Sequence, residues 1–424
     1  AMLASTAILA TLTTLTACSD SSSESVAPGS SDASEAGADT EEPIEDGAPP
    51  ACTAPVDKGP WVVAVDETTA KVRWESCVPG VSGLSFLPEE AGGAPTKVAS
   101  TVTETHVATT IQAPLISDAD FAGTYWMHEV ALTGLTAATC YEYVVDADTA
   151  AKGRFCTARR PGDAFDFIAF GDTNPGLGIT PAMVTTAYAQ KPDFTVHAGD
   201  VQYYASGLET YASWMRAMQP MLRTGAFFPA VGNHEDERDD EKRDYFDRFW
   251  GGAGFDGTND YYRFHSGGVW FFVLDTELDV SPSSLQGSWL QSQLLDAQGK
   301  PGFRFSIVYF HKPWVTCGDK SSDPATRALY TPIFEKTGVT MVIQAHMHGY
   351  ERFELGTLTY LTAGGGGGAL GRVDENKARP ECVDRKASGN FFNTVFFHVS
   401  PGELKGTVTD DHGAVRDTFT KVVP

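Results

Sequence analysis

Five short clusters of polar side chains in this 424-residue chain have the chemical types that bind metal ions. In chain order they are Gly171-Asp-Thr-Asn174, Gly199-Asp-Val-Gln-Tyr203, Gly232-Asn-His-Glu235, Val308-Tyr-Phe-His311 and Ala345-His-Met-His-Gly-Tyr-Glu-Arg352. Together they offer carboxylates, an amide oxygen, a phenol and imidazoles, the donors that suit iron, zinc or manganese. Two such cations about 3.5–4 Å apart need a bridging anion, and a carboxylate from one of the Gly-Asp turns can supply it. The set therefore predicts a two-metal site.

Taken singly, each cluster has an ordinary structural interpretation. A Gly-Asp pair after a strand is a common turn, Asn-His can cap a helix, and a single histidine at a strand end is usually a hydrogen-bonded core residue. All five, however, follow apolar runs. Beyond Pro161-Gly162 such runs alternate with helical stretches, beginning with Phe165–Phe170 and continuing to the C-terminus. The pattern predicts an α/β domain with the clusters on loops at strand ends, the usual place of α/β active sites.

The five clusters resemble those of the calcineurin-like metallophosphoesterase superfamily. The Asp-x-x-Tyr spacing of Asp200 and Tyr203 is similar to that of the purple acid phosphatases, and Tyr261–Gly268 and Leu274–Glu277 support the likeness. The resemblance spans most of the chain beyond Gly162. It implies an α/β fold: a four-layer αββα sandwich over residues 161–424, preceded by an all-β fibronectin type III-like sandwich over residues 55–160.

Carried over residue by residue, the resemblance implies a complete ligand set. The first metal would be bound by Asp172, Tyr203 and His348, the second by Asn233, His311 and His346, and Asp200 would bridge the two. Tyrosinate and carboxylate favour Fe(III) at the first site, with Zn, Fe or Mn as a divalent ion at the second. A hydroxide formed there would attack the phosphorus of a phosphate monoester in line with the leaving alkoxide. A phosphodiesterase of the same superfamily and an inactive surface-display lipoprotein are the alternatives.

The substrate side of the cleft is less fully specified. His234, beside the expected ligand Asn233, is the candidate for a hydrogen-bond donor to phosphate or a proton donor to the leaving group, against a structural role. Plant-type purple acid phosphatases carry further histidines after the strand-end histidine, but the segment 312–323 contains none. His234, Asp319 or solvent are therefore the candidates for the leaving-group acid. The glycine run 364–368 lacks the Lys-Ser/Thr of a P-loop, and we expect a flexible turn at the cleft rim.

The N-terminal segment predicts processing and anchoring. Residues 1–17 are apolar and end in a sequence that resembles a bacterial lipobox, with Cys18 as the lipidated residue. Residues 18–54 are rich in Ser, Ala, Gly and acidic residues and predict a disordered tether. Short alternating strands such as Lys71–Trp74, His128–Leu132 and Tyr141–Val145 then predict the sandwich, where His106 and His128 are expected to be hydrogen-bonded polar residues and not ligands.

The charge and the cysteine content of the chain indicate its binding partners and its cellular compartment. The 31 basic and 55 acidic side chains give a net charge of -24, which disfavours electrostatic binding to nucleic acid and means that a phosphate site needs local cations. The expected partners are a small phosphate-ester substrate and, through Cys18, a membrane; no protein partner is predicted. Six cysteines besides Cys18 suit the oxidising bacterial cell envelope. Cys140 and Cys156 flank a hairpin-like stretch, which favours a disulfide between them. We further expect disulfides joining Cys52 to Cys77 and Cys317 to Cys382; the alternative is a buried set of free thiols.

Overall fold

The computed structural model describes residues 52–90, 92–107, 123–174, 178–203, 214–236, 242–252 and 255–424. The expected signal peptide, Cys18 and nearly all of the expected tether lie outside these ranges. The described residues belong to one compact unit. None of the helices within these ranges is both long and apolar enough to span a membrane.

Eight strands make up the N-terminal part of the described chain. They are β1 (Lys58–Val63), β2 (Thr69–Ser76), β3 (Gly83–Pro88), β4 (Thr96–Ala99), β5 (Thr101–Val107), β6 (Gly123–Thr133), β7 (Cys140–Val145) and β8 (Asp148–Cys156). In β7 Tyr141, Tyr143 and Val145 are buried while Glu142 is exposed, the alternation expected of a strand with one solvated face. The order β4-β3-β7-β8 forms one sheet, and β1-β2-β6-β5 forms the end of a second.

The remaining strands alternate with helices as the sequence pattern predicts. They are β9 (Phe165–Phe170), β10 (Phe194–His197), β11 (Ala226–Pro229), β12 (Asp256–Gly257), β13 (Tyr262–Ser266), β14 (Val269–Val273), β15 (Phe305–Tyr309), β16 (Val339–Gln344), β17 (Tyr350–Leu355), β18 (Leu358–Ala363), β19 (Arg385–Gly389), β20 (Asn393–Ser400), β21 (Glu403–Asp410) and β22 (Val415–Val422). The helices are α1 (Ile179–Tyr188), α3 (Gln219–Leu222), α4 (Asn233–Asp236), α5 (Lys242–Trp250), α6 (Leu285–Gln298), α7 (Pro324–Thr337) and the 3₁₀ helix η3 (Pro380–Asp384).

Local sequence explains where the longer helices begin and end. Ser284 caps α6 by accepting a hydrogen bond from the backbone N–H of Gly287, and Asp323 caps α7 by accepting one from Thr326. α7 starts with Pro324, whose ring fits the first turn, and stops at Gly338, which adopts a left-handed conformation with φ of 79°.

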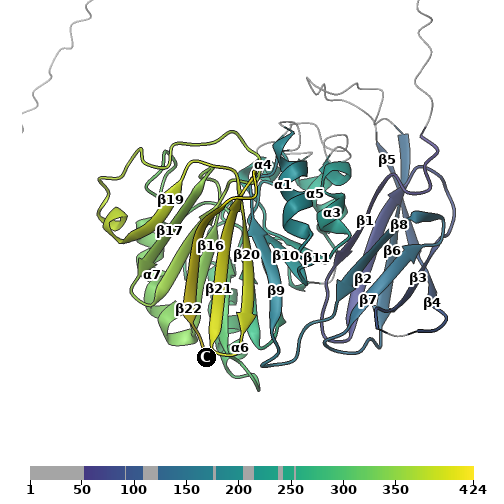
Figure 1. Ribbon diagram of the computed structural model, residues 1–424, viewed down its shortest axis with the longest axis horizontal. Helices are drawn as coiled ribbons and strands as arrows, with labels where there is room; N and C mark the ends of the chain where they lie inside the picture. The colour runs from purple at the N-terminus through teal and green to yellow at the C-terminus, as the bar shows by residue number, and fades with distance from the viewer. Residues whose placement is uncertain are drawn as a thin grey trace, which may run out of the picture. The chain divides into compact units, whose positions relative to one another are not determined.

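Two sheets and two helical layers form the α/β part, which confirms the expected four-layer αββα fold. Aromatic and aliphatic residues of β9, β10 and β20 pack against those of β13 to β16 in the core between the sheets. On the outer face of the first sheet lie α1, α3 and α5, and on the outer face of the second lie α6 and α7 (Figure 1). Both sheets have parallel strands at their centres, β9-β10-β11 and β14-β15-β16-β18.

The two parts of the chain share one sheet. β1 pairs in parallel with β11, with Val62 opposite Ala226, so that a single ten-stranded sheet runs from β22 to β5. Across this junction Arg73 donates hydrogen bonds to the carbonyls of Phe249 and Gly251 at 3.0 and 2.9 Å, and Glu75 pairs with Arg248. Trp61 packs edge-on against Trp250. The N-terminal strands thus continue the hydrogen bonding and apolar packing of the α/β part.

All three expected disulfides are present. They join Cys140 to Cys156, Cys52 to Cys77, and Cys317 to Cys382. The interpretation of His106 and His128 as hydrogen-bonded polar residues is also confirmed. His106 bonds Thr124, and the buried His128 ring lies between the hydroxyls of Ser76 and Ser100 at 3.0 and 2.9 Å.

Candidate dinuclear metal site

The loops that carry the five clusters begin where central parallel strands end. Asp172, Asp200 and Asn233 follow β9, β10 and β11, while His311 and His346 follow β15 and β16. Since the carboxyl ends of parallel strands lie at one edge of a sheet, and the two sheets face each other, the loops meet there.

Four of the predicted donors converge on one point. The Nε2 atom of His311 lies 3.0 Å from Oδ1 of Asn233, 3.1 Å from Nδ1 of His346 and 3.2 Å from Oδ2 of Asp200. An amide oxygen, two imidazole nitrogens and a carboxylate oxygen are suitable ligands for a divalent transition metal. This group has the donor set expected for the second metal.

A second group of donors surrounds Asp172. Its Oδ1 atom lies 2.8 Å from the hydroxyl of Tyr203 and 3.2 Å from Nε2 of His348, and the same hydroxyl lies 2.8 Å from that Nε2 atom. These three side chains are the ones expected at the first metal.

Asp200 belongs to both groups. One ligand atom each of Asp200, His311 and His346 lie within 4.8 Å of one another, and so do one each of Asp172, Asp200 and His348. Oδ1 of Asp200 accepts a hydrogen bond from the backbone N–H of His234 at 2.9 Å, whereas the buried Oδ2 faces Nε2 of His311 at 3.2 Å and accepts no hydrogen bond from the described residues. A buried carboxylate oxygen without a donor is costly unless a cation satisfies it, so this atom fits a bridging metal ligand.

The backbone at the donors is unusual. Asp172, Asp200 and His346 have positive φ angles of 61°, 52° and 67°, a region that residues other than glycine seldom adopt. Such conformations tend to occur at functional sites, where the surrounding structure supports them. The glycine before Asn233 is required because a side chain would clash with a donor: a Cβ on Gly232 would lie 2.2 Å from Oδ1 of Asp200.

Backbone carbonyls orient two of the imidazoles. Nδ1 of His311 donates to the carbonyl of Ala198 at 3.0 Å, and Nδ1 of His348 donates to that of Ala369 at 2.6 Å. Each bond fixes a proton on Nδ1 and directs Nε2 at the other donors, where Nε2 would be the ligand nitrogen of a bound metal ion. Metal-binding histidines are held in this way in many proteins.

The electrostatic surroundings favour a positive charge at the site. Burial opposes the charge on His311, yet the Asp200 carboxylate raises the pKa of that imidazole to about 10. For Asp172, burial also opposes ionisation, but the charge of His348 and its hydrogen bond hold the pKa of the carboxyl below its usual range. Burial, followed by the charges of Asp172 and Asp200, raises the pKa of the Tyr203 hydroxyl far above its usual value. A tyrosinate at this position therefore requires a strongly charged cation.

Glu235 has a role that the sequence reasoning missed. Its buried carboxylate accepts hydrogen bonds from the backbone N–H groups of Asp200, Val201 and Gly232 at 3.0, 2.9 and 2.8 Å. It thereby ties the loop after β10 to the loop after β11, which carries Asn233. The signal was a glutamate inside a cluster already singled out, at the start of the short helix α4.

His197 and Thr173 support the Asp172 loop from behind. The hydroxyl of Thr173 donates to the carbonyl of Val201 at 2.6 Å, accepts from Nε1 of Trp214 at 3.0 Å and lies 3.1 Å from Nε2 of His197. Burial lowers the pKa of His197 to about 3, so the ring is neutral. His197 therefore contacts the neighbour of a predicted ligand and not the predicted metal positions.

His234 lies at the surface of the donor cluster. Its side chain is 23% exposed, Nε2 is 3.9 Å from Oδ2 of Asp200, and its ring centroid is 4.3 Å from that of Tyr203. The imidazole is thus next to both groups of donors and reachable from solvent. This placement suits a group that contacts substrate.

The glycine run 364–368 differs from the expected flexible rim. It follows β18 and is buried. Gly366 and Gly368 donate backbone hydrogen bonds to the carbonyls of Gly171 and Asp172 at 3.0 and 2.8 Å. A Cβ on Gly368 would approach Tyr203 and His348 to 3.0 Å, which explains why side chains are absent. The run is thus buried against the loops of the donors and does not form an exposed rim, while its flexibility stays a prediction.

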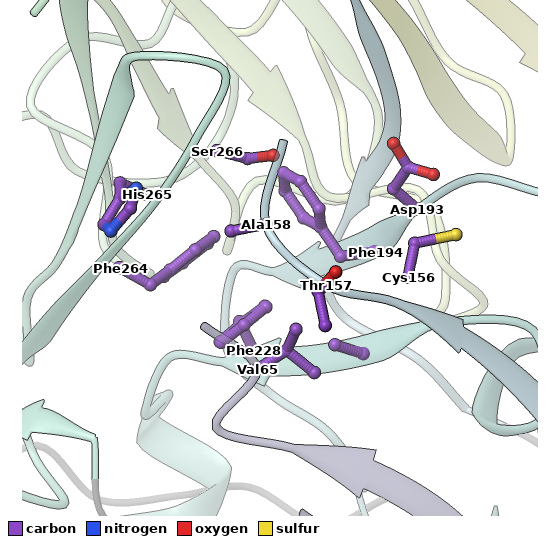
Figure 2. A pocket seen from close by; sticks show the side chains of 11 residues that line it. Val65, Cys156, Thr157, Ala158, Asp193, Phe194, Phe228, Phe264, His265 and Ser266 are labelled. Atoms are coloured by element: carbon purple, nitrogen blue, oxygen red, sulfur yellow. The ribbon is translucent and has the colours of Figure 1, made fainter. Parts of the chain in front are cut away.

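One cavity lies apart from the predicted ligands. It has a volume of about 10 Å³ and is lined by Phe194, Phe228 and Phe264 together with Asp193 and others (Figure 2). The carboxylate of Asp193 is paired with Arg159 at 2.6 Å. A space of this size holds about one water molecule. We therefore assign the cavity to packing between the N-terminal strands and the α/β part.

Comparisons with known proteins identify a phosphoesterase domain in the α/β part of the chain. Residues 165–350 match the family model described as calcineurin-like phosphoesterase. Two relatives from Arabidopsis thaliana are each 25% identical: a protein named probable inactive purple acid phosphatase 9, over 38% of this chain and 30% of the relative, and purple acid phosphatase 22, over 54% of both. The chain spans about half the length or less of these curated relatives.

A solved structure supports the fold over a larger share of the chain. The purple acid phosphatase from yellow lupin seeds superposes with a TM-score of 0.67 at 18% identity, covering 87% of this chain and 74% of the lupin chain. At this identity the likeness establishes the fold alone.

Proposed function

We propose that this chain, whose residues 165–350 form a calcineurin-like metallophosphoesterase domain similar to those of purple acid phosphatases, hydrolyses phosphate monoesters at a dinuclear metal site. The observation that carries the proposal is the convergence of seven donors from five separate loops into two groups that share Asp200.

The donor chemistry fits the metals that such enzymes use. Asp172, Tyr203 and His348 would hold Fe(III), and Asn233, His311 and His346 would hold a divalent Zn, Fe or Mn ion, with Asp200 between them. When bound, two such cations activate water as a nucleophile and withdraw charge from a phosphoester oxygen. The protein itself supplies buried, preoriented donors, held by Glu235 and by the carbonyls of Ala198 and Ala369.

His234 is proposed to act on the substrate. Its imidazole lies beside Asp200 and Tyr203 and is in reach of solvent, which supports a role in binding a phosphate oxygen or the leaving oxygen. A protonated imidazole there would donate a hydrogen bond to the phosphoryl group and pass a proton to the departing alkoxide. Asp319 and solvent are the alternative proton donors.

A spectrum tests the tyrosine ligand. Iron-loaded protein should show a visible tyrosinate-to-iron charge-transfer band, and Tyr203→Phe should abolish it while the iron content falls only in part. Tyr261→Phe, at a tyrosine outside the donor groups, is the matched control. An unchanged band in Tyr203→Phe would refute the assignment of Tyr203.

A phosphodiesterase of the same superfamily is the second candidate, because the same donors serve both reactions. The ratio of kcat/KM for a phosphate monoester and for a bis-ester with the same leaving group separates the two. We expect the monoester to be preferred. An inactive display protein would bind metal and hydrolyse neither ester at any pH or metal composition tested.

The proposed location is the bacterial cell envelope, with a lipid on Cys18. The three disulfides support an oxidising compartment. Mass spectrometry of the protein from a bacterial membrane fraction should find a diacylglyceryl mass on an N-terminal Cys18, and Cys18→Ser should release the protein from that fraction.

A further inference from the structure

The segment after His311 packs against the loop that carries His346 and His348. Gly318 is pressed against Met347, the residue between His346 and His348, since a Cβ at Gly318 would lie 2.6 Å from Cγ of Met347. The next residue, Asp319, accepts a hydrogen bond from the backbone N–H of Arg372 at 3.1 Å. Gly371 in turn donates to the carbonyl of His348 at 2.8 Å. Lys320 therefore follows directly on a stretch that packs against the paired histidines.

The backbone of Lys320 is held firmly. The guanidinium of Arg379 donates to the carbonyl of Lys320 at 3.3 Å and to that of Thr316 at 2.7 Å. The backbone N–H of Cys317 donates to Glu351 at 2.9 Å, and the disulfide to Cys382 fixes the same turn. The loop that presents Lys320 is thus preoriented, which lowers the entropic cost of using its side chain for binding.

The ammonium group of Lys320 is not used elsewhere in the described structure. It is half-buried and pairs with no carboxylate in the part of the chain that the structure describes. In a chain with a net charge of -24, such a group is a rare source of local attraction for an anion.

We propose that Lys320 binds the phosphoryl group of the substrate beside His346 and His348, on the segment where plant-type enzymes carry histidines, and that it favours dianionic monoesters over monoanionic diesters. This inference rests on the proposed function. An ammonium gains about twice as much Coulomb energy from a charge of -2 as from -1 at the same distance. A charge-assisted hydrogen bond is also stronger to a phosphoryl oxygen of the dianionic monoester, which carries more negative charge than an oxygen of the monoanionic diester.

Three variants test the role of Lys320: Lys320→Gln, Lys320→Arg and the control Lys377→Gln. Lys377 is an exposed lysine on the segment between β18 and β19 that approaches the same loop. For Lys320→Gln we expect kcat/KM on p-nitrophenyl phosphate to fall about 10-fold to 100-fold, the range for loss of one charged hydrogen bond. On bis(p-nitrophenyl) phosphate we expect a fall of less than about threefold. Lys320→Arg should retain most of the monoester rate, and Lys377→Gln should match the parent protein.

Direct binding gives a second readout that does not depend on turnover. Titration calorimetry of the metal-loaded protein with inorganic phosphate should show a Kd about 10-fold weaker for Lys320→Gln than for the parent, at equal metal content. An equal Kd, an equal loss on both esters, or loss of metal from Lys320→Gln would overturn the proposal. If the parent protein binds metal but cleaves neither ester, the proposed function fails, and the phosphate titration still decides the role of Lys320.

Discussion

At the scale of single residues, the two carboxylates of the cluster have different neighbours and should have different effects when removed. Oδ2 of Asp200 lies 3.2 Å from Nε2 of His311 and belongs to both donor groups, whereas the side-chain donors nearest Asp172 are those of the first group, Tyr203 and His348. Asp200 can therefore serve two cations and Asp172 chiefly one. This difference leads to a test that needs no knowledge of the substrate.

Asp200→Asn should lose metal from both sites, and Asp172→Asn mainly from the first, because asparagine retains one oxygen but not the charge. We expect kcat/KM to fall by about 10²-fold to 10³-fold in Asp200→Asn, because loss of the bridging carboxylate removes cations that would stabilise charge in the transition state. Metal analysis by inductively coupled plasma mass spectrometry checks the loss per site. Asp166→Asn, at a partly exposed carboxylate bonded to His398, is the control. Loss of the same single metal from both variants would contradict the bridging role.

Glu235→Gln tests the link between two donor loops. The carboxylate accepts three backbone N–H groups, and an amide can accept with only one of its two ends. We expect about 2–4 kcal/mol of lost stability from the unsatisfied buried donors, together with weaker metal binding. Urea unfolding measures the first effect. Glu335→Gln, an exposed change on α7, should cost less than about 0.5 kcal/mol, and a similar value for Glu235→Gln would count against the link.

The identity of the donor residues could be predicted from the sequence, but their support could not. Cluster order and Asp-x-x-Tyr spacing pointed to Asp172, Asp200 and Tyr203, which the structure brings together. Spacing does not reveal which backbone N–H groups a buried carboxylate will accept, so Glu235 was missed. The burial of Gly364–Gly368 could not be predicted either, because it depends on contacts with loops that are distant in the chain.

At the scale of elements, strands were the most predictable features. The apolar run Phe165–Phe170 coincides with β9, and the short runs at Lys71, His128 and Tyr141 lie within β2, β6 and β7. The local pattern of apolar and polar residues is enough to predict these strands. The pairing of β1 with β11 was not foreseen, because its partners are separated by about 160 residues and their alignment depends on tertiary packing.

The disulfide between Cys317 and Cys382 holds the turn that presents Asp319 and Lys320. Replacing both cysteines by serine should raise KM for a monoester severalfold with little change in kcat, because the loop loses its preferred position. Chain entropy predicts a loss of stability of about 4 kcal/mol for this separation of 65 residues. Removal of Cys140–Cys156, separated by 16 residues, should cost about 3 kcal/mol and leave KM unchanged below the melting temperature. Equal KM values in both variants would show that the turn is held by other contacts.

His128 makes the stability of the N-terminal strands depend on pH. Burial between Ser76 and Ser100 lowers the pKa of this imidazole below the unfolded value of 6.5. The unfolded chain therefore takes up the proton first, and stability falls as pH decreases through 6.5. Thermal melts should show a smaller loss of Tm between pH 7.5 and 5 in His128→Gln than in the parent. His412→Gln, at a side chain that is 82% exposed, should keep the parent's loss, and an unchanged slope in His128→Gln would contradict the assignment.

At the scale of the whole molecule, the shared sheet makes the α/β part depend on the N-terminal strands. Without them β11 would become an edge strand, and Phe249 and Trp250 would lose the cover of Trp61. A fragment of residues 161–424 should therefore aggregate, whereas residues 52–424 should remain monomeric. Soluble yield and size-exclusion chromatography measure both. A soluble, metal-binding fragment 161–424 would show that the two parts fold independently.

The pairing of β1 with β11 also sets an order of events during synthesis. β1 leaves the ribosome more than a hundred residues before its parallel neighbour β11. The partners of Arg73 and Glu75 are synthesised later still, since they are Phe249, Gly251 and Arg248. Until then one edge of the early strands has no hydrogen-bond partner and the buried face of Trp61 has no cover. Contacts so distant along the chain slow folding. The nascent protein thus passes through a long interval in which a chaperone would have a defined surface to protect.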